Sequence, residues 1–252
     1  MRSTKEVSLT EEGEILYDYA MQMLELEQQI RERFGSRKKE GAVLRIAAST
    51  IPSQYLLPEI MVRFRERYPG VRLRVMETDS AGAVEQILSR RADIGFAGTV
   101  LEEKQCVYIP FYQDELVVII PGEGLEGPES AAETAAWIRR MPVILREEGS
   151  GTRKEAQRLL RQMGIELSEL NIVASIQNQE TIKRSVRNGM GISILSRLAA
   201  EDEIRSGVLR AVPLGETGGK RNINLVFDRR SLHSTEAEKL IDLVKEMYPD
   251  NV

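Results

Sequence analysis

Hydrophobic residues recur at alternating spacings of three and four between Thr10 and about Phe34. The recurring positions are Leu16, Tyr19, Met23, Leu26 and Ile30. This spacing places them on one stripe of a helix and is typical of a coiled-coil seam. Thr10 is suited to cap the first amide groups of such a helix. We expect a helix over residues 10–36 that dimerises through this stripe, the alternative being a stripe that packs on the chain's own core.

A charged linker, residues 37–42, separates this helix from a different pattern, in which short aliphatic runs alternate with amphipathic segments. Strands are predicted at Leu44–Ala48, Arg72–Met76, Ile94–Ala97, Leu116–Ile120, Val143–Leu145, Ile172–Ser175, Ile192–Leu195, Leu209–Pro213 and Ile223–Phe227. Helices are predicted at Pro52–Arg67, Ala81–Arg90, Thr152–Met163, Gln179–Arg187, Ser196–Arg205 and Thr235–Met247. The alternation predicts an α/β sheet with helices on its faces.

Glycine and proline interrupt this second part at residues 121–128 and again at residues 215–219. We expect the chain to leave a first lobe near Pro121 and to return to it near Lys220. Lobe I would then comprise residues 43–120 and 220–252, and lobe II residues 121–219. Two chain crossings favour a hinge that lets the lobes close on a ligand.

Small hydroxyl and amide residues gather where the predicted strands lead into helices. We select them as candidate ligand-binding residues: Ser49, Thr50, Ser53, Ser80, Thr99, Ser150, Thr152 and Asn178. Free N–H groups at helix starts, with hydroxyl donors beside them, suit a small anion. Ligands of open α/β sheets bind beyond the carboxyl ends of the strands, where these junctions fall. The alternative is that each side chain only caps its own helix.

The amino-acid composition excludes several classes of function. The 35 basic and 39 acidic residues give a net charge of -4, which disfavours a surface that binds nucleic acid broadly. A single cysteine, Cys106, and a single histidine, His233, exclude an internal disulfide and a Cys/His zinc cluster within this sequence. Ser150 has no evident base, and no carboxylate pair suggests acid/base catalysis. We expect no metal, no cofactor and no enzymatic activity.

The amino-terminal residues also bear on location. Acidic residues follow the start of the chain closely, and the apolar core of a secretion signal is missing. The longest aliphatic run, Leu116–Ile120, is too short to cross a bilayer. We therefore expect a cytoplasmic protein that does not associate with membranes.

Several sequence segments, taken in order, resemble one family. They are Val7 to Tyr17, Tyr55-Leu56-Leu57-Pro58, Phe64 with Tyr68-Pro69-Gly70-Val71, Arg91 to Phe96, and Val186 with Asn188 to Ile192. Their order and spacing resemble the LysR-type transcriptional regulators over nearly the whole chain. Two further segments, Ala48 to Pro52 and Arg146 to Arg153, are most similar to a branch associated with sulfur or selenium metabolism.

The resemblance implies a fold and a function. It implies that residues 43–252 form a two-lobed effector-binding domain similar to type 2 periplasmic binding proteins, preceded by a dimerising linker helix. It also implies that a small anionic effector binds between the lobes of a homodimer or homotetramer and controls DNA binding by the complete protein. A solute-binding protein of a transport system and an enzyme on the same scaffold remain alternatives.

One departure from the family concerns DNA. Residues 1–9 resemble a remnant of the wing of the winged helix-turn-helix, and the recognition helix that precedes the wing in the family is missing before Arg2. Arg2 and Lys5 would make only weak, salt-sensitive phosphate contacts. We expect binding to promoter DNA only when the helix-turn-helix is present.

Overall fold

The computed structural model describes residues 10–34, 42–214, 218–230 and 234–249 of the 252-residue chain. Its contacts divide the chain into two units, Met1–Ala42 and Val43–Val252. The first unit contains helix α1, Glu11–Phe34, which confirms the helix expected from the hydrophobic spacing. Thr10 Oγ1 accepts a hydrogen bond from the Gly13 N–H at 3.1 Å, so the expected cap is confirmed as well.

The apolar stripe of α1 is exposed within the single chain. Its described side chains are Leu16, Tyr19, Met23 and Leu26. The side chain of Ile30, residues 1–9 with Arg2 and Lys5, and residues 37–41 of the linker lie outside the described residues. Dimerisation through the stripe therefore stays a prediction.

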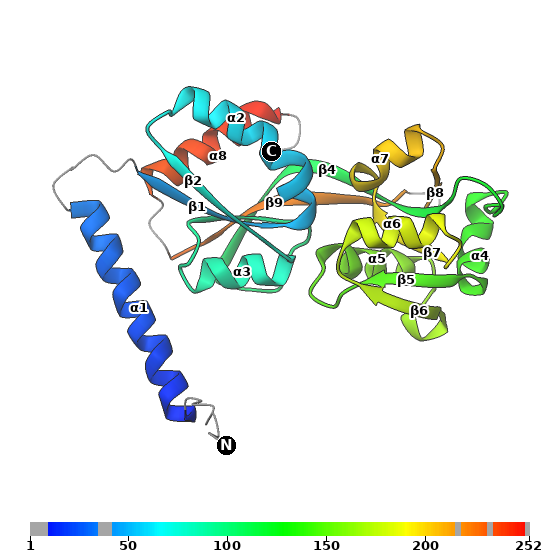
Figure 1. The fold of residues 1–252 in the computed structure, drawn as a ribbon, viewed down its shortest axis with the longest axis horizontal. Helices are drawn as coiled ribbons and strands as arrows, with labels where there is room; N and C mark the ends of the chain where they lie inside the picture. The colour runs from blue at the N-terminus through cyan, green and yellow to red at the C-terminus, as the bar shows by residue number, and fades with distance from the viewer. Residues whose placement is uncertain (1–9, 35–41, 215–217, 231–233, 250–252) are drawn as a thin grey trace, which may run out of the picture. The chain divides into compact units, whose positions relative to one another are not determined.

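The second unit is built on a mixed sheet in two halves (Figure 1). The strands of the first half follow the order β2 (Arg72–Thr78), β1 (Val43–Ser49), β3 (Ile94–Ala97), β9 (Lys220–Asp228) and β4 (Cys106–Pro121). The strands of the second half are β4, β8 (Leu209–Pro213), β7 (Ile192–Ser196), β5 (Pro142–Arg146) and β6 (Asn171–Ile176). Strands β1, β2 and β3 run parallel to one another, as do β5, β6 and β7. The α/β fold expected from the sequence is confirmed.

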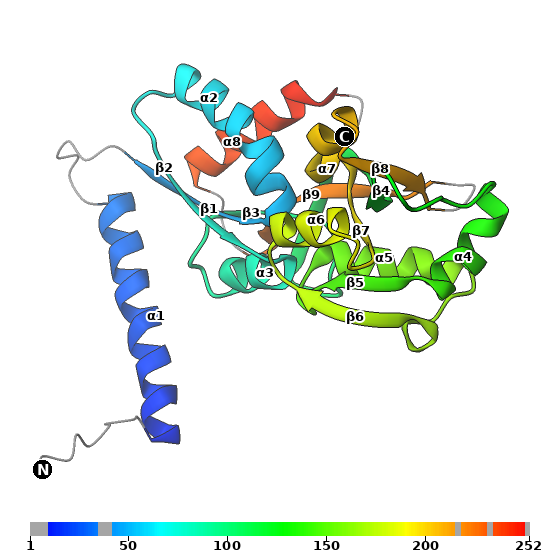
Figure 2. The same ribbon diagram turned by 45° about the vertical axis from the view of Figure 1, so that its right-hand side comes forward.

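Helices cover both faces of each half. In the first half, α2 (Leu57–Arg67) and α8 (Thr235–Met247) lie on one face and α3 (Ser80–Leu88) on the other, as Figures 1 and 2 show. In the second half, α4 (Thr134–Arg140) and α5 (Gly151–Gln162) pack on one face, and α6 (Gln179–Arg187) and α7 (Arg197–Arg205) on the other. Three short turns complete the elements: a π turn at Pro52–Leu56 and 3-10 turns at Ala131–Glu133 and Leu167–Glu169.

Strand β4 joins the two halves. Its residues from Cys106 to Glu115 pair with β9, and those from Leu116 onward pair with β7 and β8. Alternation along the second stretch explains why both faces are covered: Leu116, Val118 and Ile120 face α4 and α5, whereas Val117 and Ile119 face α6 and α7. The change of partner falls five residues before Pro121, where the sequence placed the crossing. The predicted lobe and domain boundaries stay a prediction.

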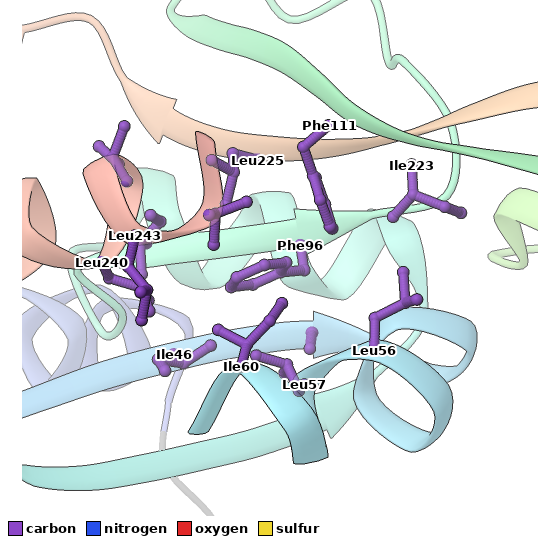
Figure 3. Close-up of a cluster of buried hydrophobic side chains, with 14 of the residues drawn as sticks. Ile46, Leu56, Leu57, Ile60, Phe96, Phe111, Ile223, Leu225, Leu240 and Leu243 are labelled. Atoms are coloured by element: carbon purple, nitrogen blue, oxygen red, sulfur yellow. The ribbon is translucent and has the colours of Figure 1, made fainter. Parts of the chain in front are cut away.

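The core of the first half sits between its sheet and the helices α2 and α8 (Figure 3). Phe96 of β3 and Phe111 of β4 meet edge to face, with ring centroids 5.6 Å apart. Phe111 is fully buried because a bulge between Pro110 and Tyr112 inserts it as an extra residue in the β4–β9 pairing. Leu240 and Leu243 of α8 close this core from the helix side.

Each of the nine predicted strands has a counterpart among β1–β9, and each predicted helix among α1–α3 and α5–α8. Two features were missed. The sequence prediction omitted helix α4, and it began β4 at Leu116 rather than at Cys106. Pro110 lacks an N–H for the sheet, and Gln113 to Glu115 are polar, so the first part of β4 lacks the usual strand pattern.

Candidate functional site

A pocket lies at the carboxyl ends of the parallel strands in both halves of the second unit. It is small and opens to solvent. The lining residues end or follow β1, β2, β3 and β5, or belong to β9: Ser49, Thr50, Ile51, Asp79, Ser80, Gly98, Arg146, Ser150, Gly151, Thr152 and Arg221. The sequence therefore predicted the edge of the sheet at which this pocket forms.

Five of the eight candidate ligand-binding residues line this one pocket. They are Ser49, Thr50, Ser80, Ser150 and Thr152. Ser53 lies in the π turn that begins at Pro52 and is outside the lining. Thr99 is buried beside the pocket, and its Oγ1 donates to Glu155 Oε1 at 2.5 Å. Asn178 caps α6 by accepting the Thr181 N–H at 3.0 Å and does not line the pocket.

Three pocket hydroxyls accept hydrogen bonds from protein N–H groups. Ser80 Oγ accepts from the Gly98 N–H at 3.3 Å, and Thr152 Oγ1 from Arg221 Nη1 at 3.2 Å. Ser150 Oγ accepts from the Arg153 N–H at 3.4 Å, which is the capping contact raised as the alternative interpretation. A hydroxyl that accepts still has its own O–H to donate. None of the three donates a hydrogen bond to another described residue.

Two buried arginines in the lining were missed by the sequence analysis. Arg221 Nε donates to Asp114 Oδ2 at 2.8 Å, and Nη2 lies 2.7 Å from the same oxygen as an ion-pair contact. The hydrogens of Nη2 nevertheless have no well-directed acceptor among the described residues. Arg146 places Nε and Nη2 each 2.8 Å from the carboxylate of Glu147. Both arginines lie at strand ends, just outside the predicted strands Val143–Leu145 and Ile223–Phe227; an arginine next to a buried apolar run was the available signal, because buried charge is rarely unpaired.

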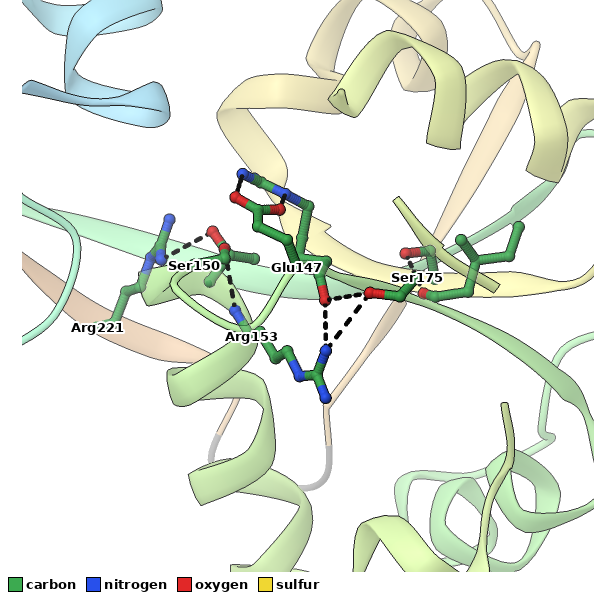
Figure 4. Close-up of polar contacts among 9 residues, drawn as sticks. Glu147, Ser150, Arg153, Ser175 and Arg221 are labelled. Carbon is green, nitrogen blue, oxygen red and sulfur yellow. Dashed lines mark hydrogen bonds and ion pairs between the residues drawn. The ribbon is translucent and has the colours of Figure 1, made fainter. Parts of the chain in front are cut away.

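The loop between β5 and α5 is fixed by its own polar contacts (Figure 4). Arg153 Nη1 donates to the backbone oxygen of Arg146 at 3.0 Å, and Ser175 Oγ donates to the same oxygen at 3.3 Å. The first bond ties α5 to the end of β5, and the second ties β6 to the same residue. The N-terminus of α5 is thereby held facing the pocket, where its free N–H groups and positive dipole end favour an anion.

The two halves of the sheet meet directly at this pocket. A Cβ added at Gly149 would lie 1.9 Å from Asp79 Oδ2, and one added at Gly151 would lie 2.3 Å from Ser80 Oγ. Lys154 Nζ also donates to the backbone oxygen of Val100 at 3.0 Å. Glycine at both positions is what lets the β5–α5 loop approach the start of α3 this closely.

The described residues give little support for a reactive thiol, a metal site or a membrane span. Burial raises the pKa of the Cys106 thiol, and its neighbours in the core include Ala97 and Val226, which agrees with its interpretation as a small buried hydrophobe. Groups of His, Cys, Asp or Glu that could hold a metal ion are not found among the described residues. His233 lies outside them. In the part of the chain that the structure describes, no helix combines the length and apolarity needed to cross a membrane.

An α/β unit whose two sheet halves meet at a small polar pocket, next to a strand common to both, has the architecture of ligand-binding domains that close around small molecules. The sequence profile of the LysR substrate binding domain matches residues 37–249. The chain therefore belongs to the LysR family of transcriptional regulators and contains its effector-binding domain. This favours the regulator over the transport alternative.

Individual relatives of known sequence are also transcriptional regulators. The HTH-type transcriptional regulator YeiE of Escherichia coli K12 is 36% identical over 217 residues, which cover 84% of this chain and 71% of YeiE. CysL of Bacillus subtilis is 28% identical over 253 residues, covering 98% of this chain and 82% of CysL.

Solved structures show the same fold. The CcmR regulatory domain of Synechocystis PCC6803 in complex with 2-PG gives a TM-score of 0.71 at 23% identity, covering 83% of this chain and 98% of that one. The effector binding domain of QuiR in complex with shikimate gives 0.72 at 14% identity, with the same shares covered. The type of two-lobed fold expected from the sequence is therefore confirmed.

Proposed function

We propose that this chain senses a small anionic effector in the pocket between the two sheet halves, and that α1 holds it in a homodimer or homotetramer. The site residues in this proposal are Ser49, Thr50, Ser80, Ser150 and Thr152. Binding would favour the closed arrangement of the lobes, and the complete regulator would transmit that change to promoter DNA through a helix-turn-helix. CcmR and QuiR, which share this fold, were solved with the acidic ligands 2-PG and shikimate.

One observation carries the proposal. The Ser80, Ser150 and Thr152 hydroxyls each accept one hydrogen bond from a protein N–H group and donate none to a described residue. They therefore offer hydrogens to a ligand that accepts, as an oxyanion or carboxylate does. The start of α5 and the Arg221 guanidinium favour negative charge at the same place.

The proposal includes no catalysis. The pocket lining holds no histidine, cysteine or lysine, and its single carboxylate, Asp79, caps helix α3 by accepting the Gly82 N–H at 2.6 Å. A nucleophile with an adjacent base is thus missing from the described lining. A non-enzymatic, cytoplasmic regulator that needs neither metal nor cofactor is the function we propose.

Calorimetric titration of the parent chain with sulfate, thiosulfate, phosphate and O-acetylserine tests the proposal. Thr50→Val and Thr152→Val should each weaken binding by about 10- to 100-fold, because each removes a hydrogen bond to a charged ligand worth roughly 1.5–3 kcal/mol. Thr152→Ser keeps the hydroxyl and should bind like the parent.

Asn178→Ala is the control for capping, since Asn178 caps α6 away from the pocket. It should lower the melting temperature and leave the affinity unchanged. If the two valine variants also lose only stability while every ligand of the parent still binds, the pocket hydroxyls are caps and the proposed site is wrong.

A further inference from the structure

The pocket contains one carboxylate, Asp79, at the start of α3. Its Oδ1 accepts the Gly82 N–H at 2.6 Å. Its Oδ2 accepts no hydrogen bond and forms no ion pair with any described residue, and it lies against Gly149 of the β5–α5 loop, where an added Cβ would be 1.9 Å from it. Helix capping uses one oxygen of Asp79 and leaves the other without a role.

The arginines do not compensate this charge. Arg221 is paired with Asp114, and Arg146 is paired with Glu147. Neither arginine pairs with Asp79, although Arg221 Nη2 keeps hydrogens without a directed acceptor among the described residues. The Asp79 carboxylate therefore has no cationic partner of its own in the lining, and it would repel a bare oxyanion at short range.

A carboxylate oxygen accepts hydrogen bonds but has no hydrogen to donate. The hydroxyls of Ser80, Ser150 and Thr152 have the opposite property in this pocket, because their hydrogens are free. In a pocket this small, a ligand that reaches these hydroxyls also lies near Asp79. The lining thus presents several donors and one acceptor to a single small ligand.

Building on the proposed function, we propose that Asp79 is a specificity-determining residue that selects anions carrying a hydrogen-bond donor of their own. Such a ligand is a protonated oxyanion, or a carboxylate with an adjacent hydroxyl or ammonium group. Its oxygens would accept from the hydroxyls, from the start of α5 and from Arg221 Nη2, and its donor would bind Asp79 Oδ2. A fully deprotonated oxyanion would leave Asp79 facing lone pairs and would be rejected.

Two pairs of tetrahedral anions isolate this effect. At about pH 8 phosphate and sulfate have nearly the same size and both carry mostly two negative charges, but only phosphate keeps a proton. Arsenate and selenate repeat the comparison at a larger radius. Calorimetry on the full chain should show the protonated member of each pair binding at least about tenfold more tightly, since one hydrogen bond to a charged group is gained and one repulsion avoided.

Asp79→Asn is the decisive variant. Asparagine caps a helix as well as aspartate does, so the melting temperature should change little. Its amide N–H₂ donates where Oδ2 accepted, so sulfate and selenate should gain affinity and the preference within each pair should fall to about threefold or less. Asp79→Ser keeps the helix cap, but the shorter serine side chain places no acceptor or donor where Oδ2 lies. This variant should bind all four anions weakly.

The outcomes separate this inference from the proposed function. One outcome is that the parent binds sulfate as tightly as phosphate and that Thr152→Val weakens sulfate binding. That result would support the anion site but overturn the role of Asp79. An unchanged preference in Asp79→Asn would overturn it as well. If all four anions fail to bind the parent, the inference fails, and the proposed function fails with it when thiosulfate and O-acetylserine also do not bind.

Discussion

Asp114 and Arg221 face each other across β4 and β9 and form an ion pair at 2.7 Å, with each side chain only 1% exposed. The pair lies immediately before the position at which β4 changes partner strand. Ser196 Oγ donates to the second oxygen of Asp114 at 2.8 Å, and Arg221 Nη1 reaches Thr152 at 3.2 Å. One buried pair thus connects β4, β9, the start of α7 and the pocket.

Removing either partner of this pair should destabilise the protein strongly. Asp114→Asn leaves a buried guanidinium without its counter-charge, and Arg221→Met leaves a buried carboxylate. We expect each to lower the free energy of unfolding by about 3–5 kcal/mol in urea titrations. The double variant should cost less than the sum of the two single variants.

The exposed pair Glu59 and Arg63 on α2 is the matched control, with its atoms 3.1 Å apart and both side chains more than half exposed. Glu59→Gln should cost about 0.5 kcal/mol or less. Equal effects in the exposed and buried pairs would contradict the importance that we assign to burial.

The glycines of the β5–α5 loop should control how closely the halves approach. In Gly151→Ala the new methyl group would overlap Ser80, and in Gly149→Ala it would overlap the Asp79 carboxylate. We expect both variants to weaken anion binding by about tenfold or more, because a ligand held from both sides loses one set of contacts. With ligand present, small-angle scattering should show a larger radius of gyration for these two variants than for the parent.

Gly70→Ala provides the comparison, since no atom lies within 4 Å of the Cβ that it would add. Its affinity should match that of the parent. Parental affinity in both loop variants would show that the close approach does not contribute to binding.

The exposed stripe of α1 should hold the oligomer together. Met23→Glu combined with Leu26→Glu places charge at two seam positions, where each buried side chain contributes roughly 1.5–3 kcal/mol. Light scattering should show a smaller oligomer than that of the parent at the same concentration. Fragment 43–252, measured in parallel, reports any second interface.

The control places the same two charges elsewhere on the helix. Met21 and Leu24 are also exposed but lie off the three- and four-residue stripe. Met21→Glu with Leu24→Glu should leave the oligomer intact. Dissociation by both pairs of substitutions, or by neither, would count against the seam.

The charge of Asp228 should make the stability of the protein fall at low pH. Hydrogen bonds from the Arg230 side chain hold the pKa of Asp228 below its ordinary value, outweighing the opposing effect of burial. A lowered pKa in the folded state stabilises the protein fully above the ordinary pKa of aspartate, about 3.9, and this stabilisation is lost as the pH falls through the folded-state value.

Asp228→Asn should therefore melt at a lower temperature than the parent at pH 7. The gap should narrow as the pH is lowered below about 4. Melting curves across this range measure it, and a gap that stays constant down to pH 2 would show that the Arg230 contact does not act through the charge of Asp228.

The sequence by itself determined the elements whose side chains repeat with a regular period. The three- and four-residue spacing in α1 and the short apolar runs of β1, β3, β5 and β7 can be recognised from adjacent residues alone. The hydroxyls at the strand ends could be recognised for the same reason, since a helix start is a local signal. Five of the eight selected residues consequently line the pocket.

Only the tertiary structure decided what depends on residues far apart in the chain. Asp114 and Arg221 are separated by 107 positions, and their pairing requires β9 to return beside β4. The first part of β4 carries Pro110 and a polar run that fit no alternating pattern, yet pairing with β9 and the bulge at Phe111 make it a strand. The sequence around Asp79 indicates only a helix cap, whereas its place in the pocket lining and the contact of its second oxygen with Gly149 depend on the approach of the other half. Such long-range contacts have no periodic signature, because their energy arises only when the chain has brought the partners together.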